Sequence, residues 1–176
     1  MERKTQPKGV ISISLIGLNT EPYGFEVTVS AGEIKDIAPE FNESVQVIGT
    51  IEKMGHRIHL TYQARALATL VCDRSLEEYT EEIVVDGSLN YSLDGELYSS
   101  QLGIEVEEDE IRGLREDAQW IDFTDDLRQD LAVALPMKRI APAYRGMEIP
   151  NLQTMEPSND AEVDDRWAAL KKISEK

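Results

Sequence analysis

The chain has 176 residues and a formal net charge of −16, because 34 acidic residues outnumber 18 basic ones. This length allows one ordinary domain with some tail or loop besides, and a content of 41% hydrophobic residues is typical of a chain that folds. The surplus of acid argues against a broad nucleic-acid-binding surface and favours cationic partners, while a small local basic patch stays compatible with it.

The sequence also indicates a compartment. The opening segment, Met1–Lys8, has no apolar stretch behind its charges, and no later stretch approaches the length of a membrane span. The single cysteine, Cys72, cannot form an internal disulfide, which fits a reducing environment, and cannot build a thiolate-rich metal cage. We therefore expect a cytoplasmic protein without a cofactor.

The first half of the chain alternates apolar and polar residues with the period of a half-buried strand. Odd positions are apolar from Tyr23 to Val29, and a second strand begins near Val45 and turns at Met54-Gly55. In the third strand every even position from Ile58 to Cys72 is apolar, so this face is predicted to be buried. Its odd positions become mixed from Leu67 to Val71, which predicts a covered region or a bulge there.

Two further strands are predicted at Ile83–Asp86 and Leu89–Leu93, separated by the turn signal Asp86-Gly87. Successive strands with short links and no helical pattern between them imply antiparallel pairing. The predicted fold class is therefore α+β, mainly β, with an antiparallel sheet or barrel-like body.

Beyond Gly95 the chain becomes strongly acidic. We expect residues 96–119 to form an acidic loop, in which the like charges of 105–110 repel one another. From Thr124 an amphipathic helix is predicted over 124–135, with Leu127 and Leu131 on its apolar side and Pro136 ending it.

The domain organisation follows from these elements. Residues 1–138 are predicted to form one globular β-rich domain that includes the acidic loop and the helix. Residues 139–176 are predicted to form an irregular tail, because prolines recur and periodicity is weak, ending in a short helix over 165–174.

Nucleophilic or metal chemistry has few candidates. A nucleophilic cysteine needs a base within hydrogen-bond reach, but the strand parity places Cys72 on the buried face and His59 on the opposite one, while His56 lies at a turn. The acids at 105–110 lack the alternating spacing and fixed glycine of a calcium loop. We expect a packing cysteine, two solvated histidines, and neither catalytic residues nor a metal site.

Two groups of residues are candidates for partner contact. Lys138, Arg139 and Arg145 form a basic cluster beside a helix end, which either complements the helix dipole or contacts an anion such as RNA phosphate. Arg166 and Trp167 lie in the last predicted helix, which either docks on the core of this chain or serves as a recognition segment.

Three segments in order resemble one known family. Cys72-Asp73-Arg74-Ser75-Leu76 resembles its C-x-R-C-L box, Leu135-Pro136-Met137-Lys138 its LPMK signature, and Asp165-Arg166-Trp167-Ala168-Ala169-Leu170 its closing DPRWAAL helix. The family is that of the YceD-like large ribosomal RNA subunit accumulation proteins of bacteria, with relatives in plastids. The resemblance implies a role in building the large ribosomal subunit and no catalytic activity.

The resemblance also marks a departure. Many members carry a second cysteine where Ser75 stands here, and further cysteines around residues 141–148, where this chain has none. A lone thiol does not hold zinc with useful affinity. Zinc is therefore not expected, and Ile140–Pro150 should be less ordered than in cysteine-bearing relatives.

The functional hypothesis is a non-catalytic factor that supports accumulation and assembly of large-subunit ribosomal RNA, with neither a membrane nor a small-molecule substrate as partner. In one version Lys138, Arg139 and Arg145, together with Arg74, contact RNA phosphates. In the alternative the chain is an acidic chaperone or adaptor that binds a basic ribosomal protein and acts on RNA only indirectly. The net charge favours this alternative.

Overall fold

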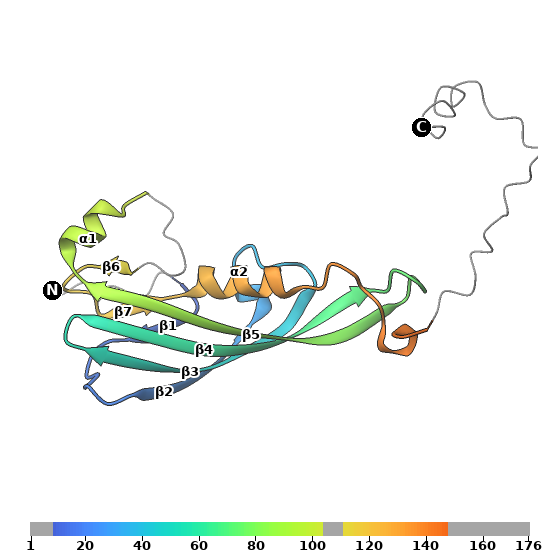
Figure 1. The fold of residues 1–176 in the computed structure, drawn as a ribbon, viewed down its shortest axis with the longest axis horizontal. Coiled ribbons are helices and arrows are strands. Elements are labelled where there is room, and N and C mark those ends of the chain that lie inside the picture. Colours follow the sequence, from blue (N-terminus) through green and yellow to red (C-terminus); the bar gives the residue numbers. More distant parts are fainter. Residues whose placement is uncertain (1–8, 104–110, 148–176) are drawn as a thin grey trace, which may run out of the picture. The chain divides into compact units, whose positions relative to one another are not determined.

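The computed structural model describes residues 9–103 and 111–147. Its main feature is a five-stranded sheet in the order β2-β3-β4-β5-β6 (Figure 1). The strands are β2 (Tyr23–Ser30), β3 (Phe41–Met54), β4 (Arg57–Val71), β5 (Glu78–Leu93) and β6 (Arg112–Leu114). The first four pair in antiparallel fashion as a meander, whereas β6 joins the end of β5 in parallel.

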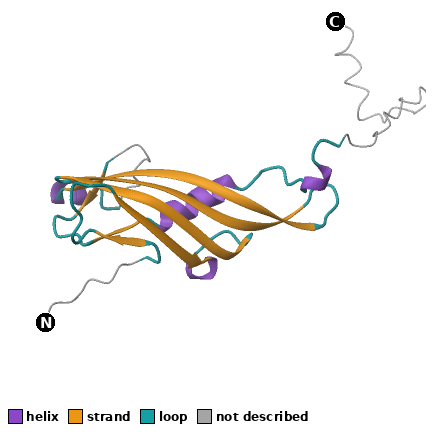
Figure 2. Cartoon of the chain, turned by 90° about the horizontal axis from the view of Figure 1, so that it is seen from below, coloured by secondary structure: helices purple, strands orange, loops and turns teal. Residues whose placement is uncertain are grey.

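The described residues also include two short strands, two α-helices and a 3-10 turn at Ala31–Glu33. β1 (Ser12–Ser14) and β7 (Trp120–Asp122) form a separate antiparallel pair, and the helices are α1 (Gly95–Ser100) and α2 (Thr124–Ala134). Figure 2 shows α2 lying against one face of the twisted five-stranded sheet. The fold is thus α+β and mainly β, as predicted, and its sheet is open and not closed into a barrel.

The segment from Pro142 onward is a separate unit from the residues up to Ala141. Its described part contains a short 3-10 turn at Pro142–Tyr144. The predicted helix at 165–174 and the acidic residues 105–110 lie outside the described residues. In the part of the chain that is described, no helix combines the length and the apolar character needed to cross a membrane.

The alternation in β4 is confirmed. Its even positions from Ile58 to Leu70 are buried, and so is Cys72 just after the strand. The predicted cover near Leu67–Val71 is wrong, because Leu67 and Val71 are 40% and 44% exposed. The alternative, an irregularity, is found in the pairing of β4 with β3, where the register shifts between Ala66 and Ala68, while the pairing with β5 is unbroken.

The predicted turn at Asp86-Gly87 is also wrong, since both residues lie inside the continuous strand β5. Gly87 pairs with Tyr62 of β4, and the Tyr62 ring lies across the glycine. A Cβ atom at position 87 would lie 2.2 Å from Cζ of that ring. The glycine is therefore required for the close approach of an aromatic side chain, and it does not mark a chain reversal.

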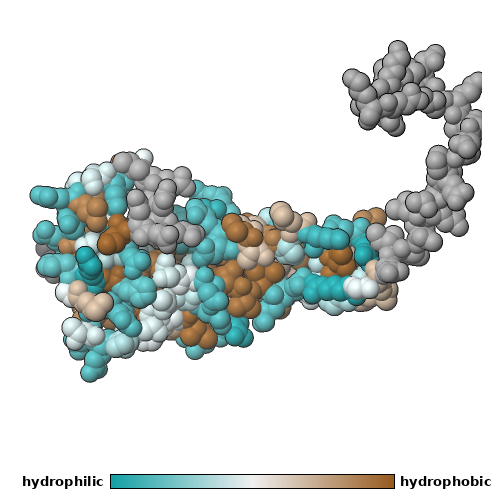
Figure 3. Space-filling model, viewed as in Figure 1, coloured by the Kyte–Doolittle hydropathy of each residue, from teal (hydrophilic) through white to brown (hydrophobic). Residues whose placement is uncertain are grey.

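The core lies between the sheet and α2. Leu127 and Leu131 of the helix are fully buried, as the helical pattern predicts. Phe123, just before the helix, packs against Phe25 and Tyr62, with ring centroids 6.0 and 5.2 Å apart. On the face drawn in Figure 3, apolar residues gather over the middle of this unit, at and around α2.

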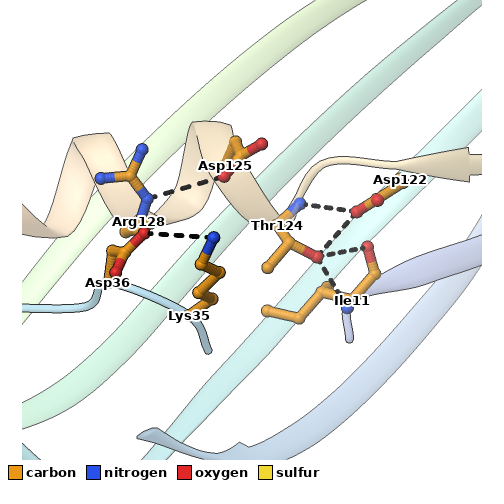
Figure 4. Close-up of polar contacts among 7 residues, drawn as sticks. All are labelled: Ile11, Lys35, Asp36, Asp122, Thr124, Asp125 and Arg128. Atoms are coloured by element: carbon orange, nitrogen blue, oxygen red, sulfur yellow. Dashed lines mark hydrogen bonds and ion pairs between the residues drawn. The ribbon is translucent and has the colours of Figure 1, made fainter. Parts of the chain in front are cut away.

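A polar network fixes the start of α2 (Figure 4). The Thr124 hydroxyl accepts the backbone N–H of Ile11 at 2.9 Å and donates to Oδ1 of Asp122 at 2.7 Å. The same carboxylate accepts the backbone N–H of Thr124 at 3.0 Å. The N-terminal segment, β7 and the helix are thereby held at one point, and α2 ends at Ala134 before Pro136.

The predicted acidic loop over 96–119 needs correction, because it contains α1 and β6. Asp94 caps α1 by accepting the backbone N–H groups of Glu96 and Leu97. Gln101 accepts the N–H of Gly113 and donates to the carbonyl of Ile111. These contacts order both ends of the interval despite its charge.

Candidate functional site

One motif segment, Cys72–Leu76, contacts the residues that directly follow another, Leu135–Lys138, at a feature that we call the Cys72 junction: the loop Cys72–Glu77 together with Arg139–Ala141. The backbone N–H of Asp73 donates to the carbonyl of Arg139, and the N–H of Arg139 donates to the Asp73 carboxylate, both at 2.7 Å. The N–H of Ala141 donates to Sγ of Cys72 at 3.3 Å. The segment that follows the Leu135–Lys138 motif is thus joined to the loop that follows β4.

The Cys72 thiol is the buried centre of this junction. Hydrogen bonds from the backbone N–H groups of Ala141 and then Ser75 lower its pKa to about 7, although burial opposes this change. The loop closes tightly: the N–H of Leu76 donates to the Cys72 carbonyl, and Leu76 has a φ of +60°. The thiol therefore serves as a hydrogen-bond acceptor within the junction.

The structure does not bring Cys72 and a histidine together. His59 lies near the beginning of β4, with Nδ1 2.9 Å from Oδ1 of Asn90, whereas Cys72 follows the end of the same strand. At a rise of about 3.3 Å per residue the two are roughly 40 Å apart. Within residues 9–103 and 111–147, no three His, Cys, Asp or Glu side chains are grouped to share a metal ion.

The predicted basic cluster is only partly assembled. Arg139 forms an ion pair with Glu40 at 2.7 Å. The pKa of Glu40 is lowered by a hydrogen bond from its own backbone and by its bond to Arg139. Arg74 and Lys138 are exposed, and each adjoins in sequence one member of the Asp73–Arg139 pair.

The remaining predicted contact residues belong to the part of the chain from Pro142 onward. Arg145 belongs to the unit that begins at Pro142, so it is described only within that unit. Arg166 and Trp167 lie outside the described residues. Arg74 and Arg139 lie in the Cys72 junction and Lys138 directly precedes Arg139, whose guanidinium is paired with the Glu40 carboxylate.

A second surface was missed by the sequence reasoning. A cleft of about 210 Å³ lies between β5 and α2. Its lining consists of Tyr62, the stretch Asp86–Asn90 of the strand, and Asp126, Gln129 and Asp130 of the helix. The side chains of Asp86 and Asn90 contact Gln63 and His59 on the opposite face of the sheet, so the carboxylates within the cleft are those of Asp126 and Asp130.

Two hydrogen-bonded contacts set the geometry of this cleft. The Tyr62 hydroxyl donates to Asp130 at 2.5 Å. The pKa of Tyr62 is raised mainly by burial and next by this hydrogen bond. Arg112 of β6 forms an ion pair with Asp126, and both side chains are mostly buried. Burial alone would lower the pKa of Arg112, but the bond to Asp126 outweighs it and raises that pKa.

The signal that could have revealed this cleft is the parity of β5. Ile83, Val85, Leu89 and Tyr91 all occupy odd positions and are all buried. A two-residue hairpin turn at Asp86-Gly87 would have moved the buried set to even positions after the turn. The unbroken parity through Gly87 indicates one strand, with Asp86 on its exposed face.

Comparison with known proteins gives one match. Residues 60–174 match the family described as "Large ribosomal RNA subunit accumulation protein YceD", which is well over half of the chain. The matched span begins within β4 and takes in β5, α2 and the Cys72 junction. No curated protein and no solved structure matches the chain.

Proposed function

The chain belongs to the YceD family of large ribosomal RNA subunit accumulation proteins, and from this premise we propose that it is a non-catalytic factor supporting the accumulation and assembly of large-subunit ribosomal RNA. The observation that carries this proposal is the family match over residues 60–174. The Cys72 junction joins one motif segment, Cys72–Leu76, to the residues that follow another, Leu135–Lys138.

We favour a version in which the chain binds a basic ribosomal protein and influences the RNA indirectly. The net charge of −16 repels polyanions at long range. Arg139, the central residue of the expected basic cluster, is held by Glu40. A phosphate group would have to compete with that carboxylate for the guanidinium, which weakens the case for a direct RNA contact.

Direct contact with RNA is the second candidate. It is supported by the exposure of Arg74 and Lys138 at the Cys72 junction. These two side chains extend from segments joined by the Asp73–Arg139 bonds, so they are carried by one local surface. Phosphate contacts of this kind would give a steep dependence of RNA affinity on salt.

A salt titration separates the two versions. Binding of the full chain to purified large-subunit ribosomal RNA and to basic ribosomal proteins is measured over a range of salt concentrations. We expect the basic proteins to bind, and the Lys138→Gln, Arg139→Gln double variant to bind them as well as the unchanged chain does. The matched control is Lys35→Gln with Arg115→Gln, which removes the same charges at exposed positions elsewhere.

The outcome that favours direct contact is also specific. It is strong RNA binding whose salt slope flattens in the Lys138→Gln, Arg139→Gln variant and not in the control. The proposed role as a whole is tested in cells that lack the chain. If the level of large-subunit ribosomal RNA is unchanged there, the proposed function is wrong.

The non-catalytic part of the proposal has its own test. Cys72 is buried among hydrogen-bond donors and lies far along the sheet from His59. Cys72→Ser should therefore support ribosomal RNA accumulation as well as the unchanged chain, apart from a loss of stability through packing. Complete loss of function in a Cys72→Ser variant that folds normally would point to chemistry at the thiol.

A further inference from the structure

Among the described residues, one edge of the main sheet is unpaired along much of β5. From Glu82 to Asn90, no described strand pairs with β5 on the side away from β4; that position is filled only from Tyr91, where β6 begins. The open part spans about 30 Å at about 3.3 Å per residue. Alternate residues of such an edge direct N–H and C=O groups outward, where they can pair with an added strand.

The helix α2 turns part of this edge into a groove. Asp86–Asn90 form one wall of the cleft described above, and Asp126, Gln129 and Asp130 of α2 form the other. The position of the helix is fixed by the bond from Tyr62 to Asp130 and by the burial of Leu127 and Leu131. An edge strand beside a helix is a geometry in which extended peptides bind by strand addition.

The charges along this edge specify the chemistry of an occupant. Glu82 and Asp86 lie on the exposed face of β5. On the other face Asp130 approaches from α2, beside Asp126, which is already paired with Arg112. Side chains of an added strand alternate between the two faces, so both sets would meet carboxylates. The matching peptide is therefore basic at successive positions, and not only at alternate ones.

Arg112 of this chain shows how a basic residue in a strand can bind at this edge. β6 occupies the end of the same edge, and its first residue, Arg112, pairs with Tyr91 of β5 in the strand register. The Arg112 guanidinium forms an ion pair with Asp126 of α2. Asp130, one helical turn further on, accepts the Tyr62 hydroxyl and keeps acceptor capacity on its carboxylate for another donor.

We propose that this acidic edge groove, formed by Glu82–Asn90 of β5 together with Asp126, Gln129 and Asp130 of α2, binds an extended segment of a protein rich in arginine and lysine as an added β-strand. The inference rests on the proposed function and deepens it, because it names the binding site and the kind of partner segment. The groove provides backbone pairing along β5 and carboxylates on both faces.

The test uses the full chain and a synthetic peptide of about nine residues, the length of the open edge, with arginine and lysine at successive positions. Affinity is measured by fluorescence anisotropy. The Asp86→Asn, Asp130→Asn double variant should bind about tenfold more weakly, since each lost ion pair contributes a factor of a few. The amide oxygen introduced by Asp130→Asn can still accept the Tyr62 hydroxyl, and an unchanged urea midpoint would show that the variant folds normally.

The matched control is Asp36→Asn with Asp125→Asn. Both carboxylates are exposed and neither lines the cleft. Asn also tolerates the positive φ of 58° at position 36. This control should bind within about twofold of the unchanged chain, because it removes the same charge without touching the groove. Equal weakening in both double variants would overturn the proposal, since net charge alone would then explain binding.

Strand addition is tested separately from charge. Two N-methylated peptides are compared, one methylated at odd and the other at even positions. Only the peptide methylated at the N–H groups that face β5 should lose binding. Hydrogen exchange should slow at amides within Glu82–Asn90 when the unmodified peptide binds. Equal binding of both methylated peptides would overturn the proposal.

The same assays distinguish this proposal from the broader one. If a large-subunit ribosomal RNA fragment binds and the basic peptide does not, the groove proposal falls while the family role stands. If the peptide binds in a groove-dependent way but cells lacking the chain keep normal ribosomal RNA, the groove proposal stands and the proposed function falls.

Discussion

Replacing Gly87 by alanine should destabilise the fold, because the Tyr62 ring occupies the space that the new methyl group needs. The added Cβ would lie 2.2 Å from Cζ of Tyr62 and 2.5 Å from its hydroxyl oxygen. The ring cannot move away cheaply, since it packs on Phe123 and its hydroxyl is bonded to Asp130.

The size of the effect follows from three contributions. Overpacking costs about 1–3 kcal/mol, and loss of a hydrogen bond to a charged acceptor costs about 1.5–3 kcal/mol. Removing a glycine from a strand interior returns about 0.5–1 kcal/mol. The net loss in the free energy of unfolding for Gly87→Ala is therefore about 1.5–5.5 kcal/mol, measured by urea denaturation followed by far-UV circular dichroism.

The decisive comparison is the same substitution in a Tyr62→Ala background. Without the ring, Gly87→Ala should stabilise the chain by about 0.5–1 kcal/mol. Gly24→Ala in β2 is the matched control, because the nearest atom to its new Cβ is the Gly49 carbonyl oxygen at 3.9 Å. A Gly87→Ala cost that is the same with and without the Tyr62 ring would refute the reasoning.

Three further outcomes are expected. Thr124→Val should cost about 1–3 kcal/mol, because the buried N–H of Ile11 loses its acceptor; Thr124→Ser should keep most of that stability in the same urea assay. The pKa of Cys72, about 7 in the folded chain, lies below that of a free thiol. The thiolate should therefore contribute fully to the free energy of unfolding above about pH 8.5, and this contribution should be lost as the pH falls through 7. In thermal melts the difference in stability between the unchanged chain and Cys72→Ser should accordingly widen from pH 6 to about pH 9. Elemental analysis of the purified, untagged chain should find no stoichiometric zinc, and one zinc per chain would contradict the expectation drawn from its single cysteine.

The elements with a strong local period could be predicted from the sequence. The alternation along β4 and the helical spacing of Leu127 and Leu131 each reflect one buried face, and the structure buries those faces. The short strands had no comparable signal. Ser12–Ser14 contains one apolar residue, and it forms a strand because it meets Trp120–Asp122, a segment far away in sequence.

The candidate site shows the same division. The motif residues around Cys72 and Lys138 could be located, but their meeting through Asp73 and Arg139 depends on contacts between distant segments. The ion pair from Arg139 to Glu40 is of the same kind, and it changes the interpretation of a residue expected to contact phosphate. The sequence shows which basic residues lie near one another along the chain, whereas tertiary contacts determine which of them are already paired with a carboxylate.

The Cys72 junction is held by hydrogen bonds, whereas the resemblance implies zinc in cysteine-bearing relatives. The bonds of Asp73, Arg139 and Ala141 each contribute about 0.5–1.5 kcal/mol net, while a structural zinc contributes about 10–16 kcal/mol to small zinc-dependent folds. Opening the junction therefore costs this chain a few kcal/mol. A partner that prefers the open form can shift an equilibrium of that size by binding. The acidic edge groove lies between β5 and α2, and the hydrogen bond from Tyr62 to Asp130 fixes its geometry. The groove and the junction share no residue, so variants at one surface should leave the other unchanged.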